Sequence, residues 1–316
     1  MDKKAGKQDT KAAPVMKAGQ VFRKTLPFAW RKFFLGLITF VLAAVAIVVI
    51  ALVQIVWLAI VVIVVLIVVH IVLWRWYGYQ IKAGHVAVIT EYMTGKGDSV
   101  PKKGMVKYGI KKFKERGFMT RAAFFILDSL IGGAVRQIQR GFNKLGRLAG
   151  RNGIVKAIVG VVNLFLGIVL GTIDECCLAY IMVHKEVGPF KGGAKGVAIW
   201  FKNFGKLMKS GVATTVVVLL VLLAITLVFG GIFYLIFMAA FSGITPGEAF
   251  LYGVIVGAAF ASALKPSFID SYIMVKMVCA YMAVVPQTQV DSATYDELSG
   301  KSPKFKELNS RAQAEG

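Results

Sequence analysis

The chain has 316 residues, of which 57% are hydrophobic, and its formal net charge is +22. Globular domains usually contain about 45–50% apolar residues, and here the apolar residues are gathered into long blocks. Composition therefore excludes an ordinary soluble protein. The expected fold class is all-α: a polytopic integral membrane helical bundle with basic amphipathic interfacial helices.

The positive charge lies in the segments between apolar blocks, where cytoplasmic loops of membrane proteins carry it. No zinc finger or aromatic-and-basic single-strand motif accompanies the charge, so we expect no nucleic-acid partner. The expected partners are the lipid bilayer, anionic lipids at its cytoplasmic face and a small organic solute. A homo-oligomer is compatible with the sequence.

Residues 1–32 carry nine Lys or Arg and predict a disordered basic cytoplasmic tail. Residues 33–74 then contain no Asp, Glu, Lys or Arg. A spanning helix needs about 20 apolar residues, so this block is long enough for a transmembrane helical hairpin. The alternative, one tilted helix, would be about twice as long as the bilayer core is thick.

Residues 75–153 predict a basic cytoplasmic or interfacial segment, with a short membrane helix at 118–133. Basic and apolar stripes at helical spacing recur in residues 106–114, 134–152 and 190–209, which is typical of helices lying in the interface. The basic stripe of the second helix, expected to bind lipid headgroups, is Arg136, Arg140, Lys144, Arg147 and Arg151. Ordinary packing beside the membrane is the alternative.

Residues 154–286 predict a membrane bundle. Basic segments flank residues 154–184 on both sides, and both are expected to be cytoplasmic. The chain must therefore cross the membrane an even number of times between them. Either 118–133 also crosses or 154–184 bends back, and the sequence leaves both open. Residues 212–240 and 248–264 predict a second hairpin with an uncharged connection, and residues 267–285 predict a further apolar helix. Residues 287–316 predict a polar C-terminal tail that is largely disordered.

Small residues recur on one face of two predicted membrane helices. They are Gly253, Gly257 and Ala261 in one helix, and Gly167 and Gly171 in the other. Such stripes let helix backbones approach closely in lipid, and we interpret them as helix-packing positions within one bundle.

Charged residues within apolar stretches indicate where a solute could bind, because a charge in the membrane usually faces a cavity or a partner. The candidate intramembrane polar site is Asp174, Glu175, Asp128, Asp270 and Lys276. Asp174 and Glu175 are interpreted either as a cation site or as partners of Lys156 or Lys276. The alternative is that both acids mark the end of a helix at the interface.

No catalytic motif, phosphate-binding loop or metal-ligand spacing is present, so neither an enzyme nor a cofactor or metal is predicted. Cys176, Cys177 and Cys279 lie in apolar stretches and form no disulfide framework.

The segment from about residue 115 onward contains Ala194-Lys195, Lys202-Asn203, Gly257-Ala258 and Phe268-Ile269-Asp270. On these residues its layout resembles the C-terminal half of choline transporter-like membrane proteins. The spacing departs from the family pattern by one residue in the segment with Ala194-Lys195 and Lys202-Asn203, and by several residues in the last hairpin. No family site residue is therefore carried over. The resemblance implies transport of a small organic cation such as choline.

Two hypotheses follow. The first is a transporter or channel for a small solute. The second is a non-transporting membrane scaffold that binds anionic lipid or partner proteins through its basic amphipathic helices. In both, the N-terminus is cytoplasmic.

Overall fold

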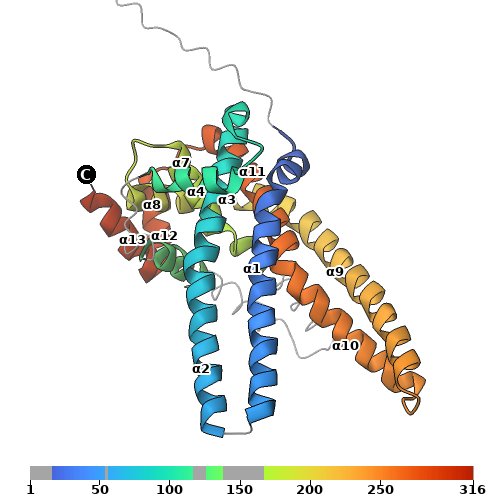
Figure 1. Cartoon of the computed structure of the whole chain (residues 1–316). Coiled ribbons are helices and arrows are strands. Elements are labelled where there is room, and N and C mark those ends of the chain that lie inside the picture. The colour runs from blue at the N-terminus through green and yellow to red at the C-terminus, as the bar shows by residue number, and fades with distance from the viewer. Residues whose placement is uncertain (1–15, 54–55, 117–125, 138–166, 316) are drawn as a thin grey trace, which may run out of the picture.

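The computed structural model describes residues 16–53, 56–116, 126–137 and 167–315, and within these ranges the regular structure is helical, with no β-strand. The all-α class is thus confirmed for the described part of the chain. Two long helical hairpins leave the same side of a helical head (Figure 1).

The first hairpin consists of α1 (Ala18–Val53) and α2 (Val56–Val72), which run side by side (Figure 1). The prediction of a disordered tail over residues 1–32 is wrong from Ala18 onward, because α1 begins there. Val21, Phe28 and Ala29 are fully buried against the head. Residues 1–15 lie outside the described ranges. The high density of Lys and Arg hid an apolar helix face, to which buried Thr25 also belongs.

The second hairpin consists of α9 (Phe204–Ala240) and α10 (Pro246–Leu264). Thr245 and Glu248 form a capping box at the start of α10, which satisfies backbone N–H groups at the helix end. Gly253 packs directly on α9, since a Cβ added there would lie 2.5 Å from the Gly230 carbonyl oxygen. At Gly257 an added Cβ would lie 2.6 Å from the Gly230 nitrogen. Glycine therefore sets the close approach of these two helices.

Each hairpin joins the head through a π-helical turn. η1 (Leu73–Gly78) links α2 to α3 (Tyr79–Met93), and η3 (Lys265–Ile269) links α10 to α11 (Asp270–Val284). The two halves have the same element order with nearly equal lengths: 36, 17, 6 and 15 residues in the first, and 37, 19, 5 and 15 in the second. The fold thus contains two units of the same element order, and their hairpins point the same way (Figure 1).

Aromatic side chains gather where the hairpins meet the head. Trp30 of α1 stacks edge-on against Phe268 of η3, with ring centroids 5.1 Å apart. Trp76 and Tyr77 of η1, the turn that joins α2 to the head, are exposed. Amphipathic aromatic rings favour the boundary between lipid and water, so this level is suited to the membrane interface.

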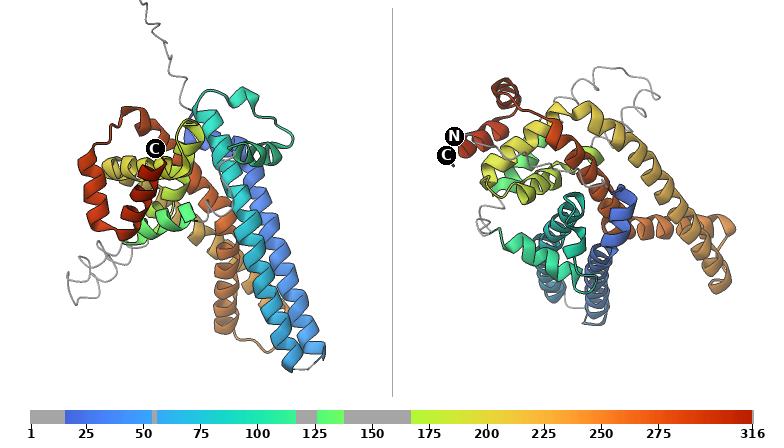
Figure 2. Two further views of the ribbon diagram at one scale, coloured as in Figure 1. Left: turned by 90° about the vertical axis from the view of Figure 1, so that its left-hand side faces the viewer. Right: turned by 90° about the horizontal axis from the view of Figure 1, so that it is seen from above.

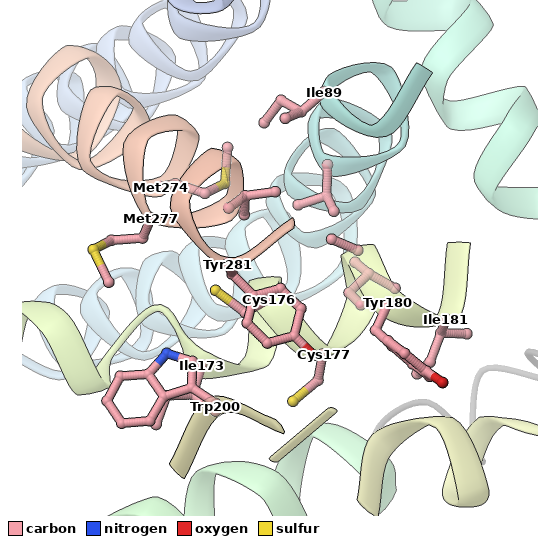
Figure 3. Close-up of a cluster of buried hydrophobic side chains, with 14 of the residues drawn as sticks. Ile89, Ile173, Cys176, Cys177, Tyr180, Ile181, Trp200, Met274, Met277 and Tyr281 are labelled. Carbon is pink, nitrogen blue, oxygen red and sulfur yellow. The ribbon is translucent and has the colours of Figure 1, made fainter. Parts of the chain in front are cut away.

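The head is built from α3 and α11 together with four shorter helical segments. These are α4 (Met105–Lys114), residues 126–137, α7 (Ile173–Val183) and α8 (Pro189–Lys202). Short 3-10 turns lie at η2 (Gly97–Ser99) and η4 (Val285–Gln287). Side chains of α3, α7, α8 and α11 converge on one core that includes Trp200 and Tyr281 (Figure 3), and the Tyr281 hydroxyl donates to the Gly196 carbonyl at 3.2 Å.

The C-terminal segment is folded as two helices, α12 (Ser292–Lys301) and α13 (Pro303–Ala314). They pack on α8, on the side of the head away from the α1–α2 hairpin (Figure 2). The sequence interpretation of residues 287–316 as a polar, largely disordered tail is therefore corrected. Phe305 and Leu308 are fully buried, and these few apolar residues at helical spacing are enough to attach a polar segment to the head.

The exposed apolar surface is concentrated on the hairpins. Among the described residues, the exposed large apolar side chains lie within 30–77 and 216–255, with Ile126 as the exception. Two stretches of the described chain are long and apolar enough to cross a membrane, Val216–Ala240 and Lys265–Gln287. The first has 11% of its most apolar window buried and the second 61%. The first is thus available to lipid, whereas the second is largely a core helix of the head.

The apolar faces of the basic amphipathic helices pack inside the head. Phe113 of α4 is buried and contacts the Tyr79 ring edge-on at 6.1 Å, and Val197 and Trp200 of α8 are fully buried. The expectation that the apolar faces of α4 and α8 enter lipid is therefore corrected. A helical period of apolar residues indicates a buried face, but it does not distinguish protein from lipid.

Candidate functional site

An ion-pair cluster in the head joins α3 to α7. The Lys82 ammonium nitrogen lies 2.5 Å from Asp174 Oδ2 and 3.2 Å from Glu175 Oε1. The side chains are 26%, 21% and 10% exposed, respectively. One cation is thus shared by two adjacent carboxyl groups in a largely desolvated position.

Local structure explains why the acids lie there. Asp174 and Glu175 occupy the first turn of α7, where the helix dipole stabilises negative charge. Lys82 lies one turn after Tyr79 on α3, and its ammonium group sits 5.7 Å from the centre of the Tyr79 ring. Buried apolar residues of α3 and α7 on either side hold the two helices together.

A third carboxyl group, that of Asp128, belongs to the same site but has no cation within salt-bridge distance among the described residues. A narrow pocket is lined by Tyr79, Lys82, Asp128, Asp174 and Glu175. Glu175 Oε2 is buried and has no hydrogen-bond partner in the described structure. Three carboxyl groups therefore share one lysine, and one of their buried oxygens is unsatisfied.

A larger cavity of about 430 Å³ opens beside this pocket. Asp128 and Asp174 line both spaces, and Ser129, Gly132 and Arg136 extend the wall of the larger one. This volume is within the range of about 300–1,000 Å³ typical of small-molecule sites. The cluster is therefore accessible to a small solute.

The protonation states follow from burial and from Lys82, and all of these groups lie in the head, outside the apolar hairpins. Burial raises the pKa of Glu175 to about 8, and the neighbouring Asp174 carboxylate adds to this effect. Burial also raises the pKa of Asp128. For Asp174, burial acts in the same direction but is outweighed by Lys82, and the net pKa is lowered. At neutral pH the cluster thus contains an Asp174–Lys82 ion pair and a protonated Glu175.

The structure brings together three of the five predicted intramembrane polar residues, namely Asp128, Asp174 and Glu175. Asp270 instead pairs with Lys265 at 2.8 Å. Lys276 forms no salt bridge with any described residue, so the suggestion that it pairs with Asp174 or Glu175 is wrong, and Lys156 lies outside the described ranges.

Sequence reasoning missed the actual partner, Lys82, and the adjacent Tyr79. Residues 75–153 are predicted to be a basic cytoplasmic or interfacial segment, in which one more lysine is not distinctive. A signal was nevertheless present: Lys82 is the one Lys or Arg between Arg75 and Lys96. A single cation in a long apolar stretch is more often paired than one within a basic run.

The predicted lipid-binding stripe is described at one position. Arg136 lines the cavity, whereas Arg140, Lys144, Arg147 and Arg151 lie outside the described ranges. Of the small residues, Gly253, Gly257 and Ala261 are buried in the second hairpin. Gly167 and Gly171 differ, because both are exposed and line the cavity. Their lack of side chains widens the cavity.

Comparison of the chain with protein-family models, with curated proteins and with solved structures finds no match.

Proposed function

We propose that this chain is a polytopic membrane protein whose two hairpins cross the bilayer, with the head at the cytoplasmic face. The exposed apolar side chains of both hairpins support this arrangement. So does the uncharged connection between α9 and α10, since loops without positive charge favour the outer side. Four crossings then leave the basic head on one side of the membrane.

We further propose that the protein is a transporter for a small organic solute carrying positive charge. The observation that carries this proposal is the cavity of about 430 Å³ lined by Asp128 and Asp174. The Asp128 carboxyl group has no cation within salt-bridge distance in the described structure, so a cationic solute has room to bind beside it. The resemblance to choline transporter-like proteins points to the same class of substrate.

The two units of the same element order are a second argument for transport. Many transporters consist of two repeated units that pack against each other. Here the two units meet in the head. Lys32 of α1 donates to Ser271 of α11 at 3.0 Å, a buried contact between the halves. The acidic cluster belongs to helices packed at this junction.

Flux into proteoliposomes tests the proposal. The purified protein is reconstituted, and uptake of labelled choline and related small cations is compared with that of empty liposomes. We expect uptake by the unmodified protein and its loss in the D174N/E175Q variant. The matched control is D98N, which removes an exposed acid from η2. Absence of uptake by folded, inserted protein would reject transport.

A non-transporting scaffold is the second candidate, favoured by the surface of α4. Lys107, Lys111 and Lys114 are exposed there, while the apolar face of the helix packs on α3. These cations could bind anionic headgroups by charge alone, at about 1 kcal/mol per residue near the membrane. The scaffold hypothesis predicts that anionic lipid in nanodiscs raises the thermal unfolding midpoint, and that K107Q/K111Q/K114Q abolishes the rise. An equal rise in the triple variant argues against it.

A further inference from the structure

The larger cavity is bipolar. Asp128 and Asp174 line it, and so does Arg136, whose guanidinium group lies beside Gly132 of the same wall. The inference drawn from this polarity rests on the proposed solute site and refines the class of solute. It is supported independently of the acids by the position of Arg136 in the wall of the same cavity.

Arg136 is folded back along its own helix. Its Nε donates to the Gly132 carbonyl at 3.0 Å, and its Nη2 lies 3.5 Å from the position that a Cβ of Gly132 would take. The guanidinium group is therefore at the level of Gly132, one turn from Asp128. Four residues of helix correspond to about 6 Å along the axis. Gly132 has no side chain to fill the space between these opposite charges.

The acidic end suits a primary ammonium group. Such a group donates three hydrogen bonds, and it can bridge the Asp128 and Asp174 carboxyl groups. A quaternary ammonium donates none and is usually held by aromatic rings. Among the described residues lining the larger cavity, none is aromatic. The lining therefore favours an amine with N–H donors over choline.

We propose that this cavity binds a short zwitterion, with its primary ammonium group at Asp128 and Asp174 and its anionic group at Arg136. Guanidinium groups bind carboxylates and phosphates through paired hydrogen bonds, which gives Arg136 a specific role. Two sources carry this chemistry: a free amino acid, and the headgroup of phosphatidylethanolamine in the surrounding bilayer.

Binding to the full-length protein in phosphatidylcholine nanodiscs tests the proposal. Three probes with the same carbon skeleton separate the charges: β-alanine has both, propylamine the cation and propionate the anion. We expect β-alanine to bind at least about tenfold more tightly than either of the others, because it engages both ends of the cavity. Choline is expected to bind more weakly than propylamine.

Variants separate the two ends. R136Q is expected to weaken β-alanine about tenfold and to leave propylamine unchanged, whereas D128N weakens both amines. The matched control for R136Q is R23Q, at an exposed arginine of α1. A folded R136Q protein is verified by an unchanged thermal unfolding midpoint. A merely structural role of Arg136 would not weaken β-alanine binding while leaving propylamine binding unchanged.

A lipid arm distinguishes the two sources. If the headgroup is the ligand, phosphatidylethanolamine raises the unfolding midpoint of the unmodified protein more than that of R136Q and weakens β-alanine binding by competition. If the free zwitterion is the ligand, the lipid changes neither. Both results support the proposal.

Two results would overturn it. Equal binding of β-alanine and propylamine, unaffected by R136Q but lost in D128N, leaves the cationic solute site in place and removes the zwitterion. No binding of any amine, together with no effect of phosphatidylethanolamine, removes the zwitterion and the proposed solute site together.

Discussion

Lys82 of α3 lies within 2.5 Å of Asp174 of α7, although 92 residues separate them in the chain. The contact joins the helix that continues the first hairpin to a helix of the middle segment. Charges removed from water are stable when each has a partner. The pair therefore fixes how these two helices are placed, and it sets the charge state of the neighbouring carboxyl groups.

Removing the shared cation should destabilise the head. K82M leaves Asp174 and Glu175 without their cation, and we expect a loss of about 2–3 kcal/mol. This is less than the about 3–5 kcal/mol typical of fully buried pairs, because the site is partly exposed. Unfolding in detergent measures it. K107M, at an exposed lysine of α4, is the control, and the K82M/D174N double variant should recover part of the loss. Equal stability of K82M and K107M would contradict the role of the pair.

Stability should fall as pH rises from about 5 to about 8. Burial raises the pKa of Glu175 from 4.5 to about 8, so across this window the folded protein holds a proton that the unfolded chain has lost. The free energy of unfolding then decreases with pH. Thermal unfolding midpoints across this range provide the measurement. E175Q, which needs no proton, should flatten the dependence, and an unchanged slope in that variant would assign it to another group.

The second hairpin should tolerate a methyl group at one glycine of α10 and not at another. G257A places a Cβ against the backbone of Thr226 and Gly230, and overpacking of this kind costs about 1–3 kcal/mol. At Gly247 an added Cβ meets nothing within 4 Å, so G247A should be neutral or slightly stabilising. The comparison uses thermal unfolding in the same detergent. If both variants behave alike, close packing of α9 and α10 is not set by Gly257.

Cysteine labelling should separate the hairpins from the head. Leu235 of α9 is 65% exposed, and in lipid vesicles L235C should resist a water-soluble maleimide. Exposed Ser292 in α12 should react as S292C, provided that the head faces the reagent in inverted vesicles. Natural Cys176, Cys177 and Cys279 are buried and give a low background. Rapid labelling of both positions would show that α9 is outside the bilayer.

The sequence alone determined the helical class and located the apolar blocks of both hairpins, because uninterrupted runs of apolar residues are a one-dimensional property of the chain. It also singled out Asp128, Asp174 and Glu175, since acids are conspicuous in apolar surroundings. It failed for α12 and α13, where the few residues that hold a polar segment to the head, Phe305 among them, are too sparse to stand out.

Tertiary structure decided which apolar and charged surfaces meet. The periodicity of α4 and α8 was visible in the sequence, but whether such a face lies against protein or lipid depends on which helices pack nearby. For the same reason Lys82 became the partner of Asp174, and Gly167 and Gly171 became the wall of a cavity. Local patterns report which groups must leave water, and only the three-dimensional arrangement determines which groups they meet.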